Sequence, residues 1–262
     1  MTRHVDRWDD HLQFVHLPYG DSQKVDMATN SEQSTMLMVT LTVLTLVSGL
    51  VDAVSYLGLG HVFTANMTGN VVLLGFAAAR APGFSGPACL TSLGSFVVGA
   101  IAAGRVTLHV TSRRHWLLIA MLLEGLFAGA AAIVSALHSG DIASGSGRFT
   151  IIAVLGFAMG VRNSTIRRLA IPDVTTTVLT MTLTGLAADS FLAGGSNPRI
   201  ARRSSAVAAM LVGAVAGATL YLHTGATWPL AVIAMVVLAT AAVFAISAGS
   251  HQLDATGTTH GT

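Results

Sequence analysis

The sequence contains little charge and only one cysteine. Charged residues make up 10% of the 262-residue chain, whereas a soluble globular domain has about 25%. A single cysteine, Cys89, excludes an internal disulfide and a metal site built from several cysteines. The few basic residues form short clusters between apolar blocks and no stripe with aromatic side chains, so we expect no nucleic-acid partner.

The sequence also lacks the short motifs of common enzymes. It contains no nucleophile elbow, no zinc-protease helix motif, no phosphate-binding glycine loop and no dinucleotide fingerprint. We therefore expect a protein that is not an enzyme, with no catalytic residue, no cofactor and no metal site. The missing nucleotide motif also argues against a pump driven by its own ATP hydrolysis.

Apolar residues are abundant instead, at 52% of the chain, and they occur in blocks of about 20. A helix of this length crosses a hydrocarbon core of about 30 Å, whereas a barrel strand needs about ten residues of alternating polarity. The blocks predict an all-α integral membrane protein whose partner is the lipid bilayer. About eight transmembrane helices are expected, at residues 36–57, 62–79, 90–110, 116–138, 149–169, 173–193, 205–223 and 228–248.

Polar segments flank the predicted membrane domain, residues 35–248. Residues 1–34 hold six of the twelve acidic residues and no apolar run that could span a membrane. Residues 249–262 are rich in glycine, threonine and histidine. We expect both segments to be disordered tails, because they have little apolar surface to bury.

The membrane domain contains two similar halves. Phe96–Ala103 matches Met210–Gly217 at an offset of 114 residues. Gly49–Asp52 matches Gly160–Asn163 at an offset of 111. Four spans per half would give two tandem four-helix repeats in one orientation, whereas three spans per half would invert them. The predicted repeats are residues 35–138 and 149–248.

The orientation in the membrane follows weakly from the basic residues. With eight spans and the N-terminus inside, eight basic residues lie on the inner side and six on the outer side. Arg3 and Arg7 lie more than about 20 residues from the first span and carry little weight, and without them the two sides tie. We expect both termini in the cytoplasm.

Four charged residues interrupt the apolar blocks: Asp52, Glu124, Arg162 and Asp189. A charge at the centre of a spanning helix is unfavourable by at least about 2.5 kcal/mol, so each needs a partner or a function. We predict an ion pair between Asp52 and Arg162 across the pseudo-axis. Glu124 has only apolar neighbours along its helix and is either a proton carrier or the partner of an arginine, and a glutamate that only holds helices together is an equal alternative.

Polar side chains also line one face of the first span. They repeat at intervals of three and four residues, at Thr42, Thr45, Ser48, Asp52 and Ser55. Such a face is either the wall of a cavity or a helix interface joined by hydroxyl groups. Asp52 favours the cavity, and we expect it to form one cluster with Asn66 and Asn70, which stand one helical turn apart.

The second half repeats this pattern with different residues. Arg162 and Asn163 stand where the first half has Asp52, and a threonine-rich stretch follows Pro172. Those threonines either line a site or only bend their helix by bonding to its carbonyls. The predicted solute-binding residues are Asp52, Ser55, Asn66, Thr68, Asn70, Arg162, Asn163, Thr177 and Thr180. The predicted proton-coupling residues are Asp52 and Glu124.

The stretches Gly49–Leu57 and Val62–Asn70 resemble the YoaK-like family of bacterial integral membrane proteins, a domain of unknown function. The resemblance continues through Gly160–Asn163 and covers about residues 35–248. It implies a bacterial inner-membrane location and, by analogy, a permease-like role, and it transfers no substrate or catalytic residue. Family members are often read with about six spans, which implies re-entrant hairpins as the alternative to eight full spans.

Two functional hypotheses follow. The first is a secondary transporter or permease for an unidentified small solute, with its polar site between the repeats. The second is a non-transporting membrane scaffold or sensor, in which the polar groups only fix helix packing. An intramembrane enzyme would need a nucleophile and a base facing one cavity, and Glu124 has no such companion in its own span.

Overall fold

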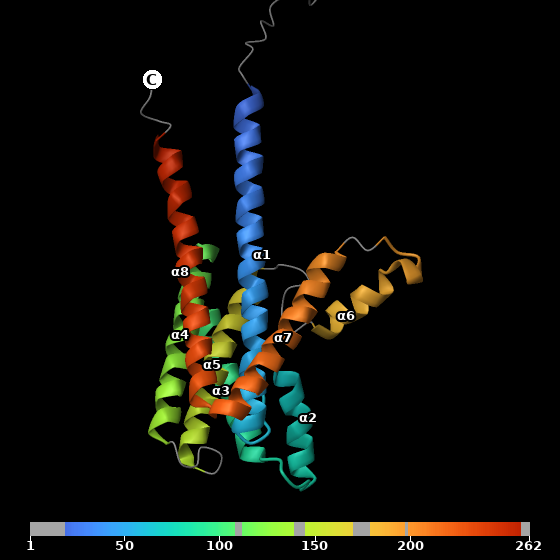
Figure 1. Ribbon diagram of the computed structural model, residues 1–262, viewed down its shortest axis with the longest axis vertical. Helices are drawn as coiled ribbons and strands as arrows, with labels where there is room; N and C mark the ends of the chain where they lie inside the picture. Colours follow the sequence, from blue (N-terminus) through green and yellow to red (C-terminus); the bar gives the residue numbers. More distant parts are fainter. Residues whose placement is uncertain (1–18, 108–111, 139–144, 170–178, 197–198, 258–262) are drawn as a thin grey trace, which may run out of the picture. The chain divides into compact units, whose positions relative to one another are not determined.

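The protein is described here from a computed structural model that covers residues 19–107, 112–138, 145–169, 179–196 and 199–257. All regular elements within these ranges are helices (Figure 1). They are α1 (Tyr19–Gly58), α2 (Met67–Ala78), α3 (Gly86–Val106), α4 (Arg113–Leu137), α5 (Ser146–Leu169), α6 (Leu179–Ala188), the 3-10 helix η2 (Phe191–Ala193), α7 (Ile200–Thr224) and α8 (Thr227–Gly257).

The chain divides into two units, Met1–Leu37 and Met38–Thr262. The described part of the first unit is the beginning of α1, which starts at Tyr19, inside the tail predicted at residues 1–34. The second unit contains the rest of α1 and all the other helices. The boundaries predicted for the membrane domain stay a prediction.

Six of the helices are long and apolar enough to cross a membrane. They are Thr35–Gly58, Gly86–Val106, Arg114–Leu137, Gly147–Arg168, Ile200–Thr224 and Thr227–Ser247. The other two, α2 and α6, have 12 and 10 residues, which gives them lengths of about 18 and 15 Å. The predicted span 62–79 therefore holds only a half-length helix, and the described part of the predicted span 173–193 holds a helix of 10 residues. Among the described residues, six helices are long and apolar enough to span.

The segment around α2 closes on itself. The ring Nδ1 of His61, before α2, lies 3.0 Å from the carbonyl oxygen of Gly83, after α2. The Phe84 ring contacts both His61 and Phe76, with ring centroids 6.1 and 5.3 Å apart. The chain thus leaves α1, runs through Val62–Asn66, returns through α2 and arrives beside its starting point.

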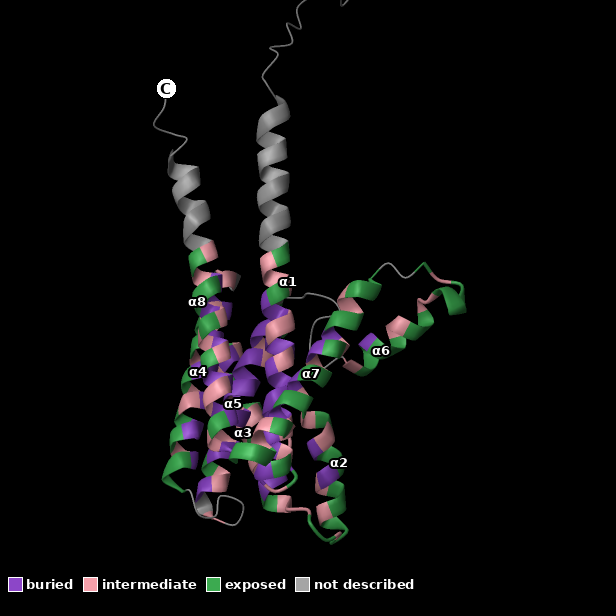
Figure 2. Ribbon diagram, viewed as in Figure 1, coloured by how far each residue is buried: buried purple, intermediate pink, exposed green. Residues whose placement is uncertain are grey.

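Buried residues gather on α1 after Met38 and on α5 (Figure 2), where 61% of each apolar window is buried. The remaining long helices turn large apolar side chains outward. Leu126 on α4, Leu211 on α7 and Met235 on α8 are 63%, 64% and 62% exposed. An apolar outer surface of this kind on a helix bundle is typical of a protein whose solvent is lipid.

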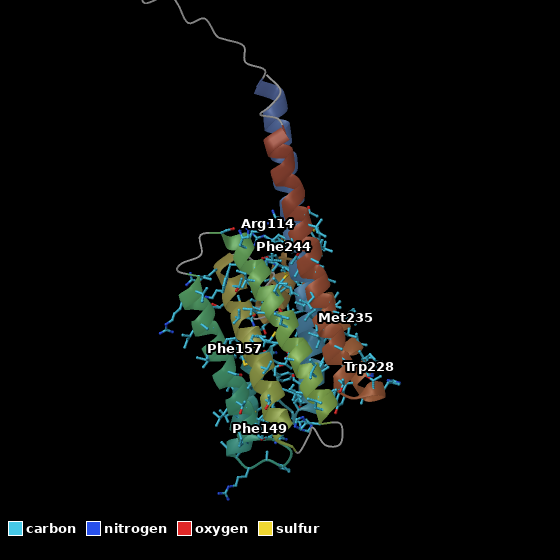
Figure 3. All side chains as sticks on the ribbon, turned by 90° about the vertical axis from the view of Figure 1, so that its left-hand side faces the viewer. Arg114, Phe149, Phe157, Trp228, Met235 and Phe244 are labelled. Atoms are coloured by element: carbon cyan, nitrogen blue, oxygen red, sulfur yellow. The ribbon has the colours of Figure 1, made fainter. Side chains whose placement is uncertain are left out.

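Helices α4 and α8 pack antiparallel along their length. Ser135, near the end of α4, bonds to Thr227 at the start of α8 through their hydroxyl groups at 2.8 Å. At the other end, the guanidinium of Arg114 lies 5.1 Å from the ring centroid of Phe244. Figure 3 shows Trp228 at the start of α8 and Arg114 beside Phe244, partway along the same helix.

Two further helix pairs touch backbone to backbone through glycines. On α1, a Cβ atom at Gly49 would overlap the Met210 carbonyl and lie 2.8 Å from the Ala214 nitrogen of α7. On α5, a Cβ atom at Gly160 would overlap the Phe96 carbonyl and lie 2.9 Å from the Ala100 nitrogen of α3. Only glycine allows helix axes to approach this closely.

These two crossings use residues at the sequence offsets of the two halves. Gly49 and Gly160 are 111 residues apart, and their contacts at residues 96 and 210, and at 100 and 214, are 114 apart. The reverse contacts agree as well, because Gly213 meets the Leu46 carbonyl and Gly99 meets the Phe157 carbonyl. Each crossing therefore joins the first helix of one predicted half to the third helix of the other predicted half.

Candidate functional site

Arg162 of α5 lies at the centre of a buried polar cluster. One guanidinium nitrogen, Nη1, donates to Glu124 Oε1 of α4 at 2.7 Å and to the Leu44 carbonyl of α1 at 3.2 Å. The other, Nη2, donates to the hydroxyl of Ser48. Both side chains of the ion pair are only 1% exposed. One arginine thus joins three helices in the interior of the protein.

The predicted ion pair between Asp52 and Arg162 is wrong. Arg162 binds α1 at Leu44 and Ser48, and Ser48 precedes Asp52 by one helical turn, about 6 Å along the axis. The carboxylate that neutralises Arg162 belongs to Glu124. Of the alternatives for Glu124, the structure shows the partner of an arginine, which is physically favoured because an unpaired buried charge is strongly destabilising.

Asp52 instead holds the chain that leads into α2. The backbone N–H groups of Thr64, Ala65 and Asn66 donate to Asp52 Oδ1, at 3.2, 2.8 and 3.3 Å. These residues precede α2, so their amides have no partner in a helix, and a carboxylate is well suited to accept hydrogen bonds from them. The carboxylate is 5% exposed. Asp52 therefore fixes residues 64–66, which lead into the start of α2.

Two buried oxygens beside this contact have no hydrogen-bond partner among the described residues. They are Oδ2 of Asp52 and the hydroxyl of Thr64. Thr64 is fully buried, and its backbone N–H is one of the three donors to Asp52 Oδ1. Buried polar atoms normally find partners, so an orphan pair at one place marks a candidate for a proton or ligand.

Asn70 binds the same segment from α2. Its Oδ1 accepts the Phe63 N–H at 2.9 Å, and its Nδ2 donates to the Phe63 carbonyl at 2.6 Å and to the Ser92 hydroxyl at 3.1 Å. Ser92 of α3 also donates to the Phe63 carbonyl, at 2.7 Å. Asp52, the Asn66 backbone and Asn70 thus meet on residues 63–66. Asn70 therefore holds the backbone of Phe63 in place through both its N–H and its carbonyl.

The other predicted site residues are scattered. Ser55 is buried and its hydroxyl donates to the Asp52 carbonyl at 3.3 Å. The side chains of Asn66 and Thr68 are exposed, and so is Thr180 on α6, away from the Asp52 contact. Asn163 is half-buried next to Arg162. Thr177 lies outside the described residues.

The hydroxyl groups on the α1 face bond to their own helix. Thr42 donates to the Met38 carbonyl, Thr45 to the Leu41 carbonyl and Ser48 to the Leu44 carbonyl, at 2.9, 2.9 and 3.0 Å. Such bonds satisfy the hydroxyls without a ligand or a second helix. Two side chains of this face also bond to residues outside α1: Asp52 accepts from the Ala65 backbone, and Ser48 accepts from Arg162.

The structure adds residues that sequence reasoning missed. Ser92 gave no signal beyond being a serine in an apolar span, and the Leu44 carbonyl gave none at all. A third omission is a cavity of about 470 Å³ at the end of α6, where Asp189 pairs with Arg203. The clue there was a charged residue, Asp189, followed within 14 positions by an arginine cluster.

Long apolar helices with outward-facing apolar side chains and an interior ion pair define a multi-pass α-helical membrane protein. Residues 40–243 match the family described as "Protein of unknown function (DUF1275)", and the chain belongs to this family. The resemblance to the YoaK-like family is thereby confirmed.

One relative is the "UPF0700 transmembrane protein YoaK" of Bacillus subtilis (strain 168), which is 34% identical over 149 residues. The match covers 57% of this chain and 65% of the relative, so the chain spans just under two thirds of that protein's length. No solved structure matches the chain.

Proposed function

We propose that the protein is a secondary transporter for a small solute, built from two inverted repeats that each contain a broken helix. The observation that carries this proposal is the short apolar helix α2, and the described part of α6, which is also a short apolar helix, stands at the corresponding second position of the other predicted half. Discontinuous helices at corresponding positions of two repeats are typical of transporters and lie next to the transported solute.

The helix count supports inverted repeats. Six long spans leave three in each half, and an odd number reverses the direction of the second half relative to the first. The equivalent glycine crossings of α1 with α7 and of α3 with α5 support the same pairing of halves. In this proposal α2 is a re-entrant helix, because His61 and Gly83 are neighbours at its two ends.

The six-span arrangement also assigns an orientation. Only Arg80 and Arg148 fall on the side of the α2 segment. The side of both termini has Lys24, Arg105, Arg113, Arg114, Arg167, Arg168, Arg199, Arg202 and Arg203. Because short cytoplasmic loops are enriched in lysine and arginine, both termini are cytoplasmic in a bacterial inner membrane. The tie found with eight spans disappears.

Asp52 is the proposed proton-coupling residue. Its Oδ1 is occupied by three backbone N–H groups, while its buried Oδ2 is one of the orphan atoms. A proton on Oδ2 would neutralise the carboxylate without removing the bonds on Oδ1. The charge beside the start of α2 would then change while the backbone of residues 64–66 stays in place. Glu124 is the second candidate, but its charge is matched by Arg162.

The test is solute-driven proton movement in proteoliposomes that contain a pH-sensitive dye. A panel of small solutes is added to vesicles with the wild-type protein, with Asp52→Asn and with Asp189→Asn. Asparagine keeps an oxygen for the three amides but cannot exchange a proton. We expect at least one solute to drive proton flux in the wild type and in Asp189→Asn, and none to do so in Asp52→Asn. Equal flux with Asp52→Asn would contradict the coupling role.

A non-transporting scaffold or sensor is the second candidate. The observation that favours it is the back-bonding of the α1 hydroxyl groups, which need no solute. It predicts no solute-driven flux for any variant, and an effect of Asp52→Asn that is limited to melting temperature and protein abundance. The same vesicles, with melting curves of the purified variants, separate the two functions.

A further inference from the structure

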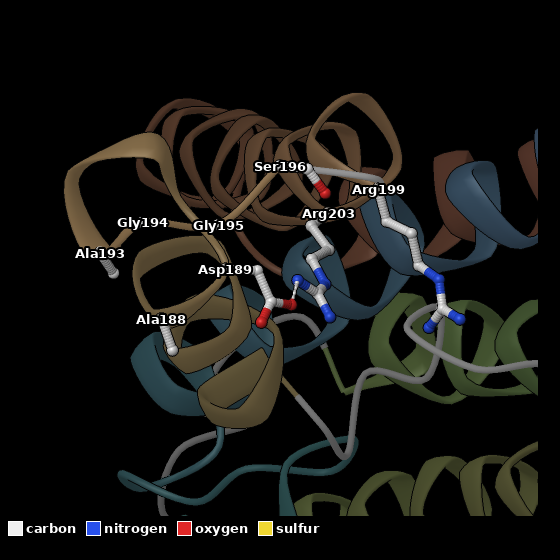
Figure 4. A pocket seen from close by; sticks show the side chains of 8 residues that line it. All are labelled: Ala188, Asp189, Ala193, Gly194, Gly195, Ser196, Arg199 and Arg203. Atoms are coloured by element: carbon white, nitrogen blue, oxygen red, sulfur yellow. Dashed lines mark hydrogen bonds and ion pairs between the residues drawn. The ribbon is translucent and has the colours of Figure 1, made fainter.

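The buried interior contains more acidic than basic side chains. Among the described residues, the charged side chains that are buried are Asp52, Glu124 and Arg162. Glu124 and Arg162 neutralise each other in their ion pair. Figure 4 shows that Asp189, the other charged residue of the apolar blocks, pairs with Arg203 beside a cavity, where its side chain is 45% exposed. The negative charge of Asp52 therefore has no counter-ion among the buried side chains that the structure describes.

The hydrogen bonds on Asp52 reduce this imbalance without removing it. The three backbone N–H groups that donate to Asp52 Oδ1 are dipoles and carry no net charge. An uncompensated charge in an apolar interior is strongly unfavourable. Asp52 thus needs a bound proton or another cation, whereas a neutral solute or an anion would leave its charge unbalanced.

The orphan atoms at this place suit a hydrogen-bond donor. Asp52 Oδ2 and the Thr64 hydroxyl are both buried without a partner, and the two residues are joined by the Thr64 N–H bond to Oδ1 at 3.2 Å. An alkylammonium group, like that of lysine, has three N–H donors and no acceptor. Ions such as Ca²⁺ and Mg²⁺ take about six or more oxygen ligands. Two orphan oxygens therefore fit an ammonium group better than a bare metal ion.

Aromatic side chains stand next to both orphan atoms along the chain. Tyr56 follows Asp52 by one helical turn, and Phe63 directly precedes Thr64. The Tyr56 and Phe63 rings stack, with centroids 4.9 Å apart and planes at 24°. Tyr56 also contacts the exposed ring of His61 at 5.2 Å, so the aromatic pair extends towards the surface. Aromatic faces attract organic cations and offer an apolar surface to their alkyl groups.

We propose that the transported solute is an organic cation with a primary ammonium group, which binds Asp52 Oδ2 and the Thr64 hydroxyl in place of the proton. This inference rests on the proposed transport function and names its substrate class. The proton leaves Oδ2 for water when the ammonium binds, so the formal charge of the interior is the same in both states. Asp52 is 5% exposed and Thr64 is fully buried, so the structure describes the site closed.

Other titratable or charged side chains stand on the elements around this site. They are Tyr56, His61, Cys89, Glu124, Arg148, Arg162 and Tyr221. Glu124 is the one carboxylate among them, and Arg162 binds it. A proton released when an ammonium ion binds near neutral pH is therefore expected to come from Asp52.

The test counts the protons that the purified full-length protein releases in detergent, with a pH-sensitive dye in weak buffer. The probes are methylammonium, butylammonium and benzylammonium, with acetamide as the neutral solute and sodium as the metal ion, all at the same ionic strength. We expect at least one ammonium ion to release a single proton per protein in a saturable way. Acetamide and sodium should release none, and Asp52→Asn should abolish the release.

Thr64→Val separates a binding role from a structural one. The Thr64 hydroxyl has no partner, so valine loses no hydrogen bond and should not lower the melting temperature. It should raise the ammonium concentration for half-maximal proton release about tenfold, the usual effect of losing a hydrogen bond to a charged group. The control is Thr91→Val, whose hydroxyl donates to the Pro87 carbonyl, and it should leave that concentration unchanged.

Several results would overturn the inference. No release by any of the three ammonium ions, or equal release by acetamide, would remove the cation site, and equal release by sodium would show a site for metal ions. Equal shifts for Thr64→Val and Thr91→Val would remove Thr64 from the site, and this comparison decides if Asp52→Asn does not fold.

The measurement does not depend on transport. Proton release in detergent without proton flux in vesicles would leave the ammonium site standing and contradict the transporter. Proton flux driven only by neutral or anionic solutes, without release by ammonium ions, would contradict the ammonium site alone.

Discussion

The protein contains two arginine–carboxylate pairs of the same chemistry in different surroundings. Arg162 and Glu124 are each 1% exposed, and the arginine also bonds to α1. Arg203 and Asp189 are 12% and 45% exposed and line a cavity. The first pair joins three helices, whereas the second leaves its carboxylate half open to the surroundings. Burial thus separates a pair that joins helices in the interior from one that is partly exposed.

The largest effect is expected when Glu124 loses its carboxylate in the buried Arg162–Glu124 pair, the inner pair. Glu124→Ala leaves the Arg162 charge buried without its partner, which is destabilising by about 3 to 5 kcal/mol. Glu124→Gln keeps an acceptor and should be milder. Thermal and denaturant unfolding in detergent measure both. The matched control is Leu126→Ala on the same helix, whose side chain is 63% exposed. A Glu124→Ala protein as stable as this control would contradict the structural role of the inner pair.

The next effect concerns the helix crossing beside the inner pair. Gly160 precedes Arg162 by two residues and touches the α3 backbone, so Gly160→Ala must push α5 away from α3. Overpacking of this kind is destabilising by about 1 to 3 kcal/mol. Gly94→Ala on α3 is the control, since nothing lies within 4 Å of its added Cβ. Unfolding curves that are the same for both variants would show that the crossing tolerates separation.

The smallest effect is expected at the partly exposed Arg203–Asp189 pair, the outer pair. Asp189→Asn removes one charge from a pair that is partly exposed, and such pairs contribute about 0 to 1 kcal/mol. The unfolding free energy should therefore change little in the same thermal and denaturant unfolding measurements. A loss of stability as large as that of Glu124→Ala would erase the distinction between the two pairs.

Much of the fold follows from the sequence, but the choice of partners does not. Apolar blocks predict the long spans, and the offsets of 111 and 114 align glycines that occupy matching crossings. The sequence favours an ion pair of Arg162 with Asp52 because Asp52 matches Asn163 in the second half and Arg162 is the neighbour of Asn163. The carboxylate that pairs with Arg162 depends on which turn of α1 faces α5. The angle at which these two helices cross cannot be read from the sequence.

The length of α2 illustrates a second limit. Residues 62–79 form an apolar run long enough for a short span, yet the helix begins only at Met67. The preceding residues are not helical, because Asp52 and Asn70 bind the backbone of residues 63–66. Hydropathy counts apolar side chains and cannot detect a distant carboxylate that takes up backbone amides. Hydropathy alone therefore does not reveal the half-length of α2, which the six-span alternative only implies.

The central claim is that the segment from His61 to Gly83 enters and leaves the membrane on one side. It is tested by labelling single cysteines in cells with a membrane-impermeant maleimide, after replacement of the buried Cys89 by serine. His61→Cys and Pro82→Cys should both react from the outside, and Ser196→Cys should react only after the membrane is opened. Reaction of His61→Cys and Pro82→Cys from opposite sides would mean that α2 crosses the bilayer, and the inverted-repeat account would be wrong.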